Sequence, residues 1–223
     1  EEDKEIDKKI VRRHEQALMC IINLVQKYPQ VLLKHIPLLV STIIRCLDPS
    51  APRRRKALLS ATTASLHVLV TKYPNVAFHQ ETQHFAIGTG PARDNCILIY
   101  DLRTTTRWKQ LKGHRAAITA IEFNSDGQYL ISYSAYERPP TVKCWYIGSG
   151  GFFNSLLSLT SGAYSNGSGM IKCIKTCPMP PLDRLYPPID HLQYTKLTWN
   201  NKVKGAVKLQ RENQSVLFFT VLP

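Results

Sequence analysis

The feature that most constrains the fold is a change of period in the apolar residues near residue 77. From about Lys8 to Val76 apolar residues recur at helical spacing, and no glycine interrupts them. After Ala77 glycines appear, and apolar residues alternate with polar ones in short runs, as in β-strands. The pattern predicts an α+β chain with two domains, a helical one over residues 1–78 and a β-rich one over residues 79–223.

Three helices are expected in the first domain. The first contains apolar residues in an i, i+3, i+4 series between Ile10 and Val25, which lie on one face. The second ends at Leu47, because the following DPSAP sequence removes backbone donors and disfavours helix. The third begins near Arg53 and ends before Pro74.

Two of the helical stretches end in copies of one sequence. Residues 24–31 read LVQKYPQV and residues 69–76 read LVTKYPNV, which places Tyr28 and Tyr73 45 positions apart. A period of roughly 40–47 residues is typical of HEAT and armadillo solenoids. We therefore expect an α-solenoid, with more repeats preceding Glu1 because two units are too few for stability.

The basic cluster Arg53, Arg54, Arg55 and Lys56 has two interpretations. Together with Asp48 it resembles the turn and second-helix start of HEAT repeats, a family in which such Asp and Arg residues tie adjacent repeats together. Alternatively the cluster is a partner-binding patch, because cations are unfavourable at a helix start and an acidic partner would offset that cost. We favour the structural interpretation and keep the second as a hypothesis.

The β-rich domain is expected to contain short strands separated by turns. The Gly/Ser-rich stretch from Gly148 to Gly169 is expected to be a flexible loop with an apolar contact. The segments with strand-like alternation are residues 85–87, 97–100, 108–111, 118–123, 129–134, 141–145, 170–175, 196–199, 203–209 and 215–221. This is material for two to three propeller blades, fewer than the roughly four to eight of a closed propeller. We expect the missing blades to come from another part of the same protein or from a partner chain.

One stretch of this domain resembles a WD repeat. Gly113 and His114 open the unit, residues 125–127 (SDG) supply its turn, and Trp145 closes it. The preceding unit ends at Tyr100-Asp101. The resemblance implies incomplete WD40-type β-propeller blades after the helices.

The WD family also implies a structural network. In that family a His, a strand Ser or Thr, a turn Asp and the Trp are linked by hydrogen bonds that brace the blade. His114, Ser132 or Ser134, and Trp145 match this pattern. Glu137, after a tyrosine, stands where the Asp is expected, so we expect the network to be incomplete and His114 to be structural.

Composition excludes some functions and leaves others open. The net charge of +13 suits an acidic protein, an anionic membrane or nucleic acid, but no nucleic-acid-reading module accompanies it. Cys173, Cys177 and His191 form at most a partial metal site. We find no catalytic motif, and expect no enzyme activity, cofactor or metal. The apolar runs are too short to span a membrane.

A wider resemblance covers roughly residues 27–145. The sequences YPNVAFH at 73–79, YDLRT at 100–104 and LKGH at 111–114 are similar to the C-terminal region of the rabconnectin-3 beta (WD-repeat protein 7) family. That resemblance implies a cytoplasmic scaffold, peripheral on synaptic vesicles or endolysosomes. Its implied partners are the DmX-like rabconnectin-3 alpha subunit, subunits of the vacuolar proton pump (V-ATPase), whose assembly it promotes, and Rab GTPase regulators. The alternatives are a generic WD-repeat adaptor and, third, a basic nucleic-acid-binding module.

Overall fold

The computed structural model describes residues 2–148, 172–200, 203 and 205–222. The helical part consists of α1 (Glu2–Lys27), α2 (Pro29–Leu32), the 3-10 turn η1 (Leu33–His35), α3 (Ile36–Arg45) and α4 (Pro52–Lys72). A proline lies in the first turn of α2, α3 and α4, where its missing N–H costs nothing. Within the described residues no helix combines the length and hydrophobicity needed to cross a bilayer.

The strands form three antiparallel sheets, each a simple meander. The first contains β1 (Val76–His79), β2 (His84–Gly88), β3 (Ile97–Asp101) and β4 (Thr106–Leu111), with the short η2 (Pro91–Arg93) between β2 and β3. The second contains β5 (Ala120–Phe123), β6 (Tyr129–Ser134), β7 (Thr141–Tyr146) and β8 (Lys172–Pro178). The third follows α6 (Pro188–Tyr194) and contains only β9 (Lys196–Trp199), β10 (Ala206–Gln210) and β11 (Val216–Thr220).

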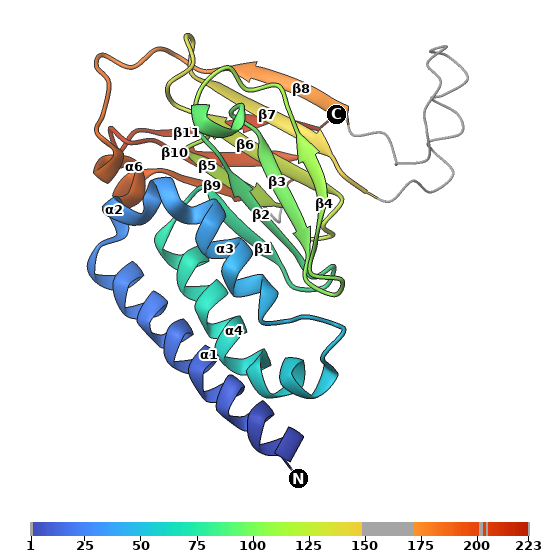
Figure 1. The fold of residues 1–223 in the computed structure, drawn as a ribbon. Helices are drawn as coiled ribbons and strands as arrows, with labels where there is room; N and C mark the ends of the chain where they lie inside the picture. The colour runs from blue at the N-terminus through green and yellow to red at the C-terminus, as the bar shows by residue number, and fades with distance from the viewer. Residues whose placement is uncertain (1, 149–171, 201–202, 204, 223) are drawn as a thin grey trace.

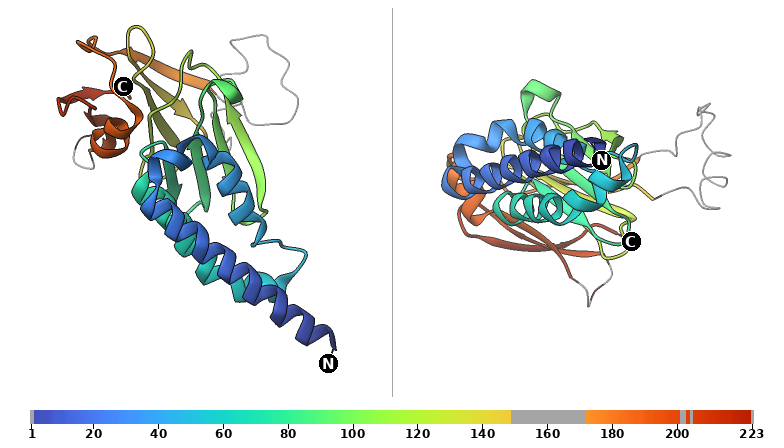
Figure 2. Two further views of the ribbon diagram at one scale, coloured as in Figure 1. Left: turned by 60° about the vertical axis from the view of Figure 1, so that its left-hand side comes forward. Right: turned by 60° about the horizontal axis from the view of Figure 1, so that its bottom comes forward.

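The elements stack in layers that follow the order of the chain. The innermost strands β1, β5 and β9 are neighbours in space, which sets the three sheets face to face like successive blades of a propeller. The helices cover the remaining face of the first sheet, and the long pair α1 and α4 extends away from the sheets (Figures 1 and 2). Two of the sheets thus have the four strands of a propeller blade and the third has three, and helices occupy one end of the stack.

Strand β3 shows how the period-two pattern builds two cores at once. Leu98 faces the helices and joins Val25, Ile44 and Leu69 in one buried cluster. Its neighbours Ile97 and Ile99 face the second sheet and join a different cluster. All three side chains are at most 2% exposed, so the first sheet needs a cover on both faces.

The expected α-solenoid is wrong. Helices α1 and α4 pack side by side, α3 packs on α4, and their apolar faces share one core with the first sheet rather than with further helical repeats. Arg55 also ties the helices to the first sheet rather than to another helical repeat. Its guanidinium donates to the carbonyls of Leu47, Leu102 (3.0 Å) and Arg103 (3.1 Å), and so joins the start of α4 to the turn after β3. Asp48 accepts hydrogen bonds from Ser50 within its own turn.

The two copies of the repeated sequence are not structurally equivalent. Tyr28 is 53% exposed, whereas Tyr73 is fully buried and its hydroxyl donates to the Pro29 carbonyl at 3.0 Å. After the first copy the chain enters α2, but after the second Val76 begins β1 and pairs with Ile87. The second copy therefore packs on the first instead of repeating its role, and β1 crosses the boundary expected at residue 78.

The third sheet differs from the first two in having one exposed face. Leu209 and Phe219 point toward the second sheet, whereas Lys208 and Phe218, a cross-strand pair, point away from it. Residues 149–169 of the expected Gly/Ser-rich loop lie outside the described residues. Helix α6 arises in a proline-rich stretch for which no helix is expected from the sequence.

The inequivalence of the two tyrosines is testable. We expect Tyr73→Phe to lower the free energy of unfolding by about 1 kcal/mol, because the hydrogen bond from the buried Tyr73 hydroxyl to the Pro29 carbonyl is lost. The matched variant Tyr28→Phe should change it by less than about 0.5 kcal/mol. Urea unfolding followed by circular dichroism measures both. Equal losses would restore the equivalent-repeat interpretation.

Candidate functional site

The second sheet is braced by a buried hydrogen-bond network. In the middle of β6, the Ser132 hydroxyl accepts from the Trp145 indole N–H at 2.8 Å and lies 2.7 Å from His114 Nε2. The other ring nitrogen of His114, Nδ1, lies 2.7 Å from Glu137 Oε1. The network thus joins the segment before β5, strands β6 and β7, and the β6–β7 loop.

Glu137 is the anionic end of this network. Burial alone would raise its pKa, but hydrogen bonds from His114 and from the Arg115 amide, at 2.7 Å, lower the pKa to about 2. An ionised carboxylate only accepts hydrogen bonds, so His114 Nδ1 must carry the proton that lies between them. The Ser132 hydroxyl is then free to donate to Nε2 while accepting from Trp145.

The structure brings together three of the four residues proposed for the network. Ser134 lies outside it, because its hydroxyl donates to the Ala117 carbonyl at 2.7 Å. Glu137 completes the chain of bonds, contrary to the expectation of an incomplete network, since a glutamate in the β6–β7 loop reaches the position where the family pattern requires an acid. In the sequence, the position of Glu137 where the WD family has an Asp was the sign that it could take this place.

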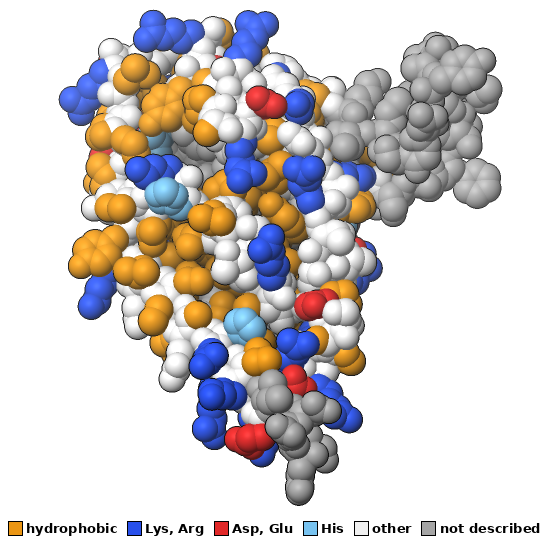
Figure 3. All heavy atoms as spheres, viewed as in Figure 1, with side chains coloured by type: hydrophobic (Ala, Val, Ile, Leu, Met, Phe, Trp, Pro, Cys, Tyr) orange, Lys and Arg blue, Asp and Glu red, His pale blue; other side chains and the backbone are white. Residues whose placement is uncertain are grey.

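The basic cluster at the start of α4 divides into residues with different roles. Arg55 is held by three carbonyls, as described above, and Arg54 Nε lies 3.4 Å from the Asp7 carboxylate on α1. Arg53 and Lys56 are exposed, and neither side chain has a hydrogen bond or ion pair within the described part of the chain. Figure 3 shows cations gathered at this end of the helices, beside hydrophobic side chains along the helical face. Only part of the cluster is thus available to a partner.

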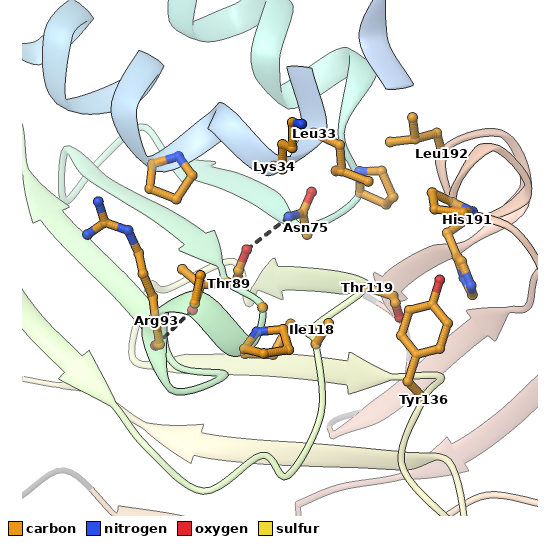
Figure 4. A pocket seen from close by; sticks show the side chains of 18 of the residues that line it. Leu33, Lys34, Asn75, Thr89, Arg93, Ile118, Thr119, Tyr136, His191 and Leu192 are labelled. Atoms are coloured by element: carbon orange, nitrogen blue, oxygen red, sulfur yellow. Dashed lines mark hydrogen bonds between the residues drawn. The ribbon is translucent and has the colours of Figure 1, made fainter. Parts of the chain in front are cut away.

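A cavity lies where the helices meet the ends of the inner strands. It has a volume of about 660 Å³, and its walls come from α2 and η1, the β2–β3 and β6–β7 loops, the segment before β5, and α6. Figure 4 shows Arg93 at one end of the cavity, Tyr136 and His191 at the other, and Lys34 on the helical side. Sequence reasoning missed this site because its walls are distant in the chain.

A buried polar cluster lies behind His191. Glu212 is 2% exposed, and its carboxylate accepts from Thr195 at 3.4 Å and from Tyr133 at 3.3 Å. His191 Nδ1 lies 3.7 Å from the same carboxylate, while burial lowers the pKa of His191. Among the described residues no group of three or more His, Cys, Asp or Glu is arranged to hold a metal ion. Cys173 and Cys177 lie on β8.

Comparison with solved structures gives matches at low sequence identity. No family model matches the chain. The structure of U3-55K aligns with a TM-score of 0.36 and 16% identity, over 65% of this chain and 36% of that one. The crystal structure of Sqt1 from Chaetomium thermophilum aligns with a TM-score of 0.39 and 14% identity, over 66% and 33%. The chain spans about a third of the length of each, and similarity at this level supports no inference about function.

The role of Ser132 as the hub of the network generates a stability prediction. We expect Ser132→Ala to lower the free energy of unfolding by about 2–4 kcal/mol, because His114 and Trp145 each lose a buried partner. The control Ser134→Ala should cost about 1 kcal/mol, since it removes one hydrogen bond. Thermal and urea unfolding measure the difference. A smaller loss for Ser132→Ala than for Ser134→Ala would contradict the network.

The lowered pKa of Glu137 generates a prediction about acid stability. Its pKa falls from 4.5 to about 2 in the folded chain, so the unfolded chain binds the proton more readily. The resulting stabilisation, on the order of 1–3 kcal/mol, is present above pH 4.5 and lost as the pH falls toward 2. Glu137→Gln should flatten the pH dependence of unfolding in this range, whereas the exposed Glu81→Gln should not. An unchanged slope for Glu137→Gln would contradict the assignment.

Proposed function

We propose that the chain is a non-catalytic interaction module of a scaffold protein. The observation that carries this proposal is the third sheet, which has three strands where the first two have four. Strand β11 is an edge of this sheet: among the described residues its outer side pairs with no strand, and its Thr220 carbonyl accepts a hydrogen bond from the Lys175 side chain at 3.0 Å. An open strand edge is a common surface for binding extended protein segments.

The exposed side chains of β11 support the same function. Phe218 is 73% exposed and Val216 is 42% exposed, and both lie on the face turned away from the second sheet. Large exposed aromatic residues are enriched among interface residues that contribute most to binding. Lys208, the cross-strand neighbour of Phe218, adds a cation that suits an acidic partner.

The complex we propose is of the rabconnectin-3 type. The motifs at residues 73–79, 100–104 and 111–114 support it, and its partners would be the DmX-like alpha subunit and the soluble sector of the vacuolar proton pump. In this role the chain acts on the cytoplasmic surface of synaptic vesicles or endolysosomes, where it promotes pump assembly and acidification; regulators of Rab GTPases are further candidate partners.

A second candidate function is that of an adaptor in an unrelated complex. The blade-like sheets favour it, because propeller blades serve many assemblies and the fold does not specify the partner. Immunoprecipitation of the tagged chain, with blots for the alpha subunit and for pump subunits, separates the candidates. Recovery of either supports the rabconnectin-3 type complex. Recovery of neither, from cells that express both, contradicts it and leaves the adaptor function.

Phe218 provides a test of the proposed surface. We expect Phe218→Glu to reduce recovery of the bound partner about tenfold or more, because it places a charge at the centre of the apolar contact. The matched control is Met19→Glu on α1, where the native side chain is 57% exposed. Both variants should keep the wild-type circular dichroism spectrum. Unchanged recovery with Phe218→Glu would exclude β11 as the interface.

A further inference from the structure

The cavity between the helices and the strand ends has mainly apolar walls. Val31, Leu33, Pro74, Ile118 and Leu192 contribute hydrocarbon from four separate segments. Its volume of about 660 Å³ is in the range of sites that bind ligands. A solvent-filled cavity with such walls favours an occupant that brings apolar groups.

The hydroxyl groups of the cavity wall are already satisfied by the protein itself. Thr89 Oγ1 donates to the Cys96 carbonyl at 2.8 Å, and Thr119 Oγ1 donates to the Tyr133 carbonyl at 3.2 Å. The hydroxyls of these two threonines are therefore not free to bind an occupant of the cavity. A small polar metabolite would find few groups to fix its orientation here, because such sites need several convergent polar contacts.

The Lys and Arg residues that line the cavity are unpaired cations within the described part of the chain. Lys34 and Arg93 line it and are exposed, and neither side chain has a hydrogen bond or ion pair to another described residue. None of the residues that line the cavity is an aspartate or glutamate. Three acids adjoin the wall without lining it: Asp94 is paired with Lys112 at 3.0 Å, and Asp190 and Glu212 lie close to His191. The cavity is thus complementary to an anionic occupant, as is the whole chain with its charge of +13.

Two buried polar side chains in the wall each have one atom without a hydrogen-bond partner among the described residues. Asn75 is 7% exposed, and its Nδ2 donates to the Gly88 carbonyl at 2.9 Å, but its Oδ1 has no hydrogen bond within the described residues. His191 is 4% exposed, and its Nε2 likewise has none. Buried polar groups are normally paired, so both atoms are available to polar groups of an occupant. Peptide groups of an occupant offer both donors and acceptors.

We propose that this cavity binds an extended, acidic segment of a partner protein. The apolar side chains of the segment pack between Leu33, Ile118 and Leu192, and its carboxylates face Lys34 and Arg93. The inference rests on the proposed scaffold function and adds to it a second contact, remote in sequence from β11, with a stated chemistry. A basic or nucleic-acid occupant is disfavoured, the first by charge and the second by the apolar walls.

Selection from a library of random peptides displayed on phage tests the proposal on the intact chain. Selected peptides should contain acidic and apolar residues together. Their binding, measured by fluorescence polarisation, should weaken about tenfold or more in the double variant Lys34→Glu/Arg93→Glu. The matched control is Lys9→Glu/Arg13→Glu on α1, which makes the same change of charge at exposed positions and should leave binding unchanged.

A second variant separates the cavity from charge effects. Ala92 is exposed and lines the cavity, so Ala92→Trp should obstruct it without disturbing the core and should abolish binding of the selected peptides. Selection of peptides without acids, or equal binding to Ala92→Trp and wild type, would overturn the proposal. Equal losses in the two double variants would show attraction to net charge alone and also overturn it.

The two proposals fail in different ways. The scaffold function fails when no partner is recovered with the wild-type chain, whatever peptides the cavity selects. The cavity proposal fails when partners are recovered but the selected peptides bind the Lys34→Glu/Arg93→Glu and Ala92→Trp variants as tightly as the wild-type chain. Measuring both in parallel distinguishes these results.

Discussion

The structure depends on one constraint, which is that the first two sheets are apolar on both faces. Successive residues of β3 enter different cores, so neither face can be left in water. The helices meet this requirement on one side and the following sheet meets it on the other. A four-stranded sheet that would be unstable alone thereby becomes the middle layer of a larger fold.

The contacts that hold the helices to the sheet are specific as well as hydrophobic. Arg55 joins α4 to the turn after β3, and Tyr73 joins the end of α4 to the start of α2. These polar contacts fix the angle at which the apolar faces meet. The cavity lies beside this junction, so its shape is set by the same contacts that hold the layers together.

Much of the local structure could be predicted from the sequence, because the two periods are strong. The layers could not be predicted, since two nearly identical copies, at Tyr28 and Tyr73, lead into different structures. At the candidate site the WD motif indicated His114, Ser132 and Trp145, whose spacing is characteristic, but gave no role to Glu137. The cavity was unpredictable for another reason, because its walls are formed by segments far apart in the chain.

The order of the layers also bears on how the chain emerges during synthesis. A two-sided sheet exposes its apolar faces until both covers exist, and exposed strands are prone to aggregate. Because the helices precede β1 in the chain, one cover for the first sheet is made before that sheet. Each later sheet then meets the apolar face of the sheet before it as it leaves the ribosome.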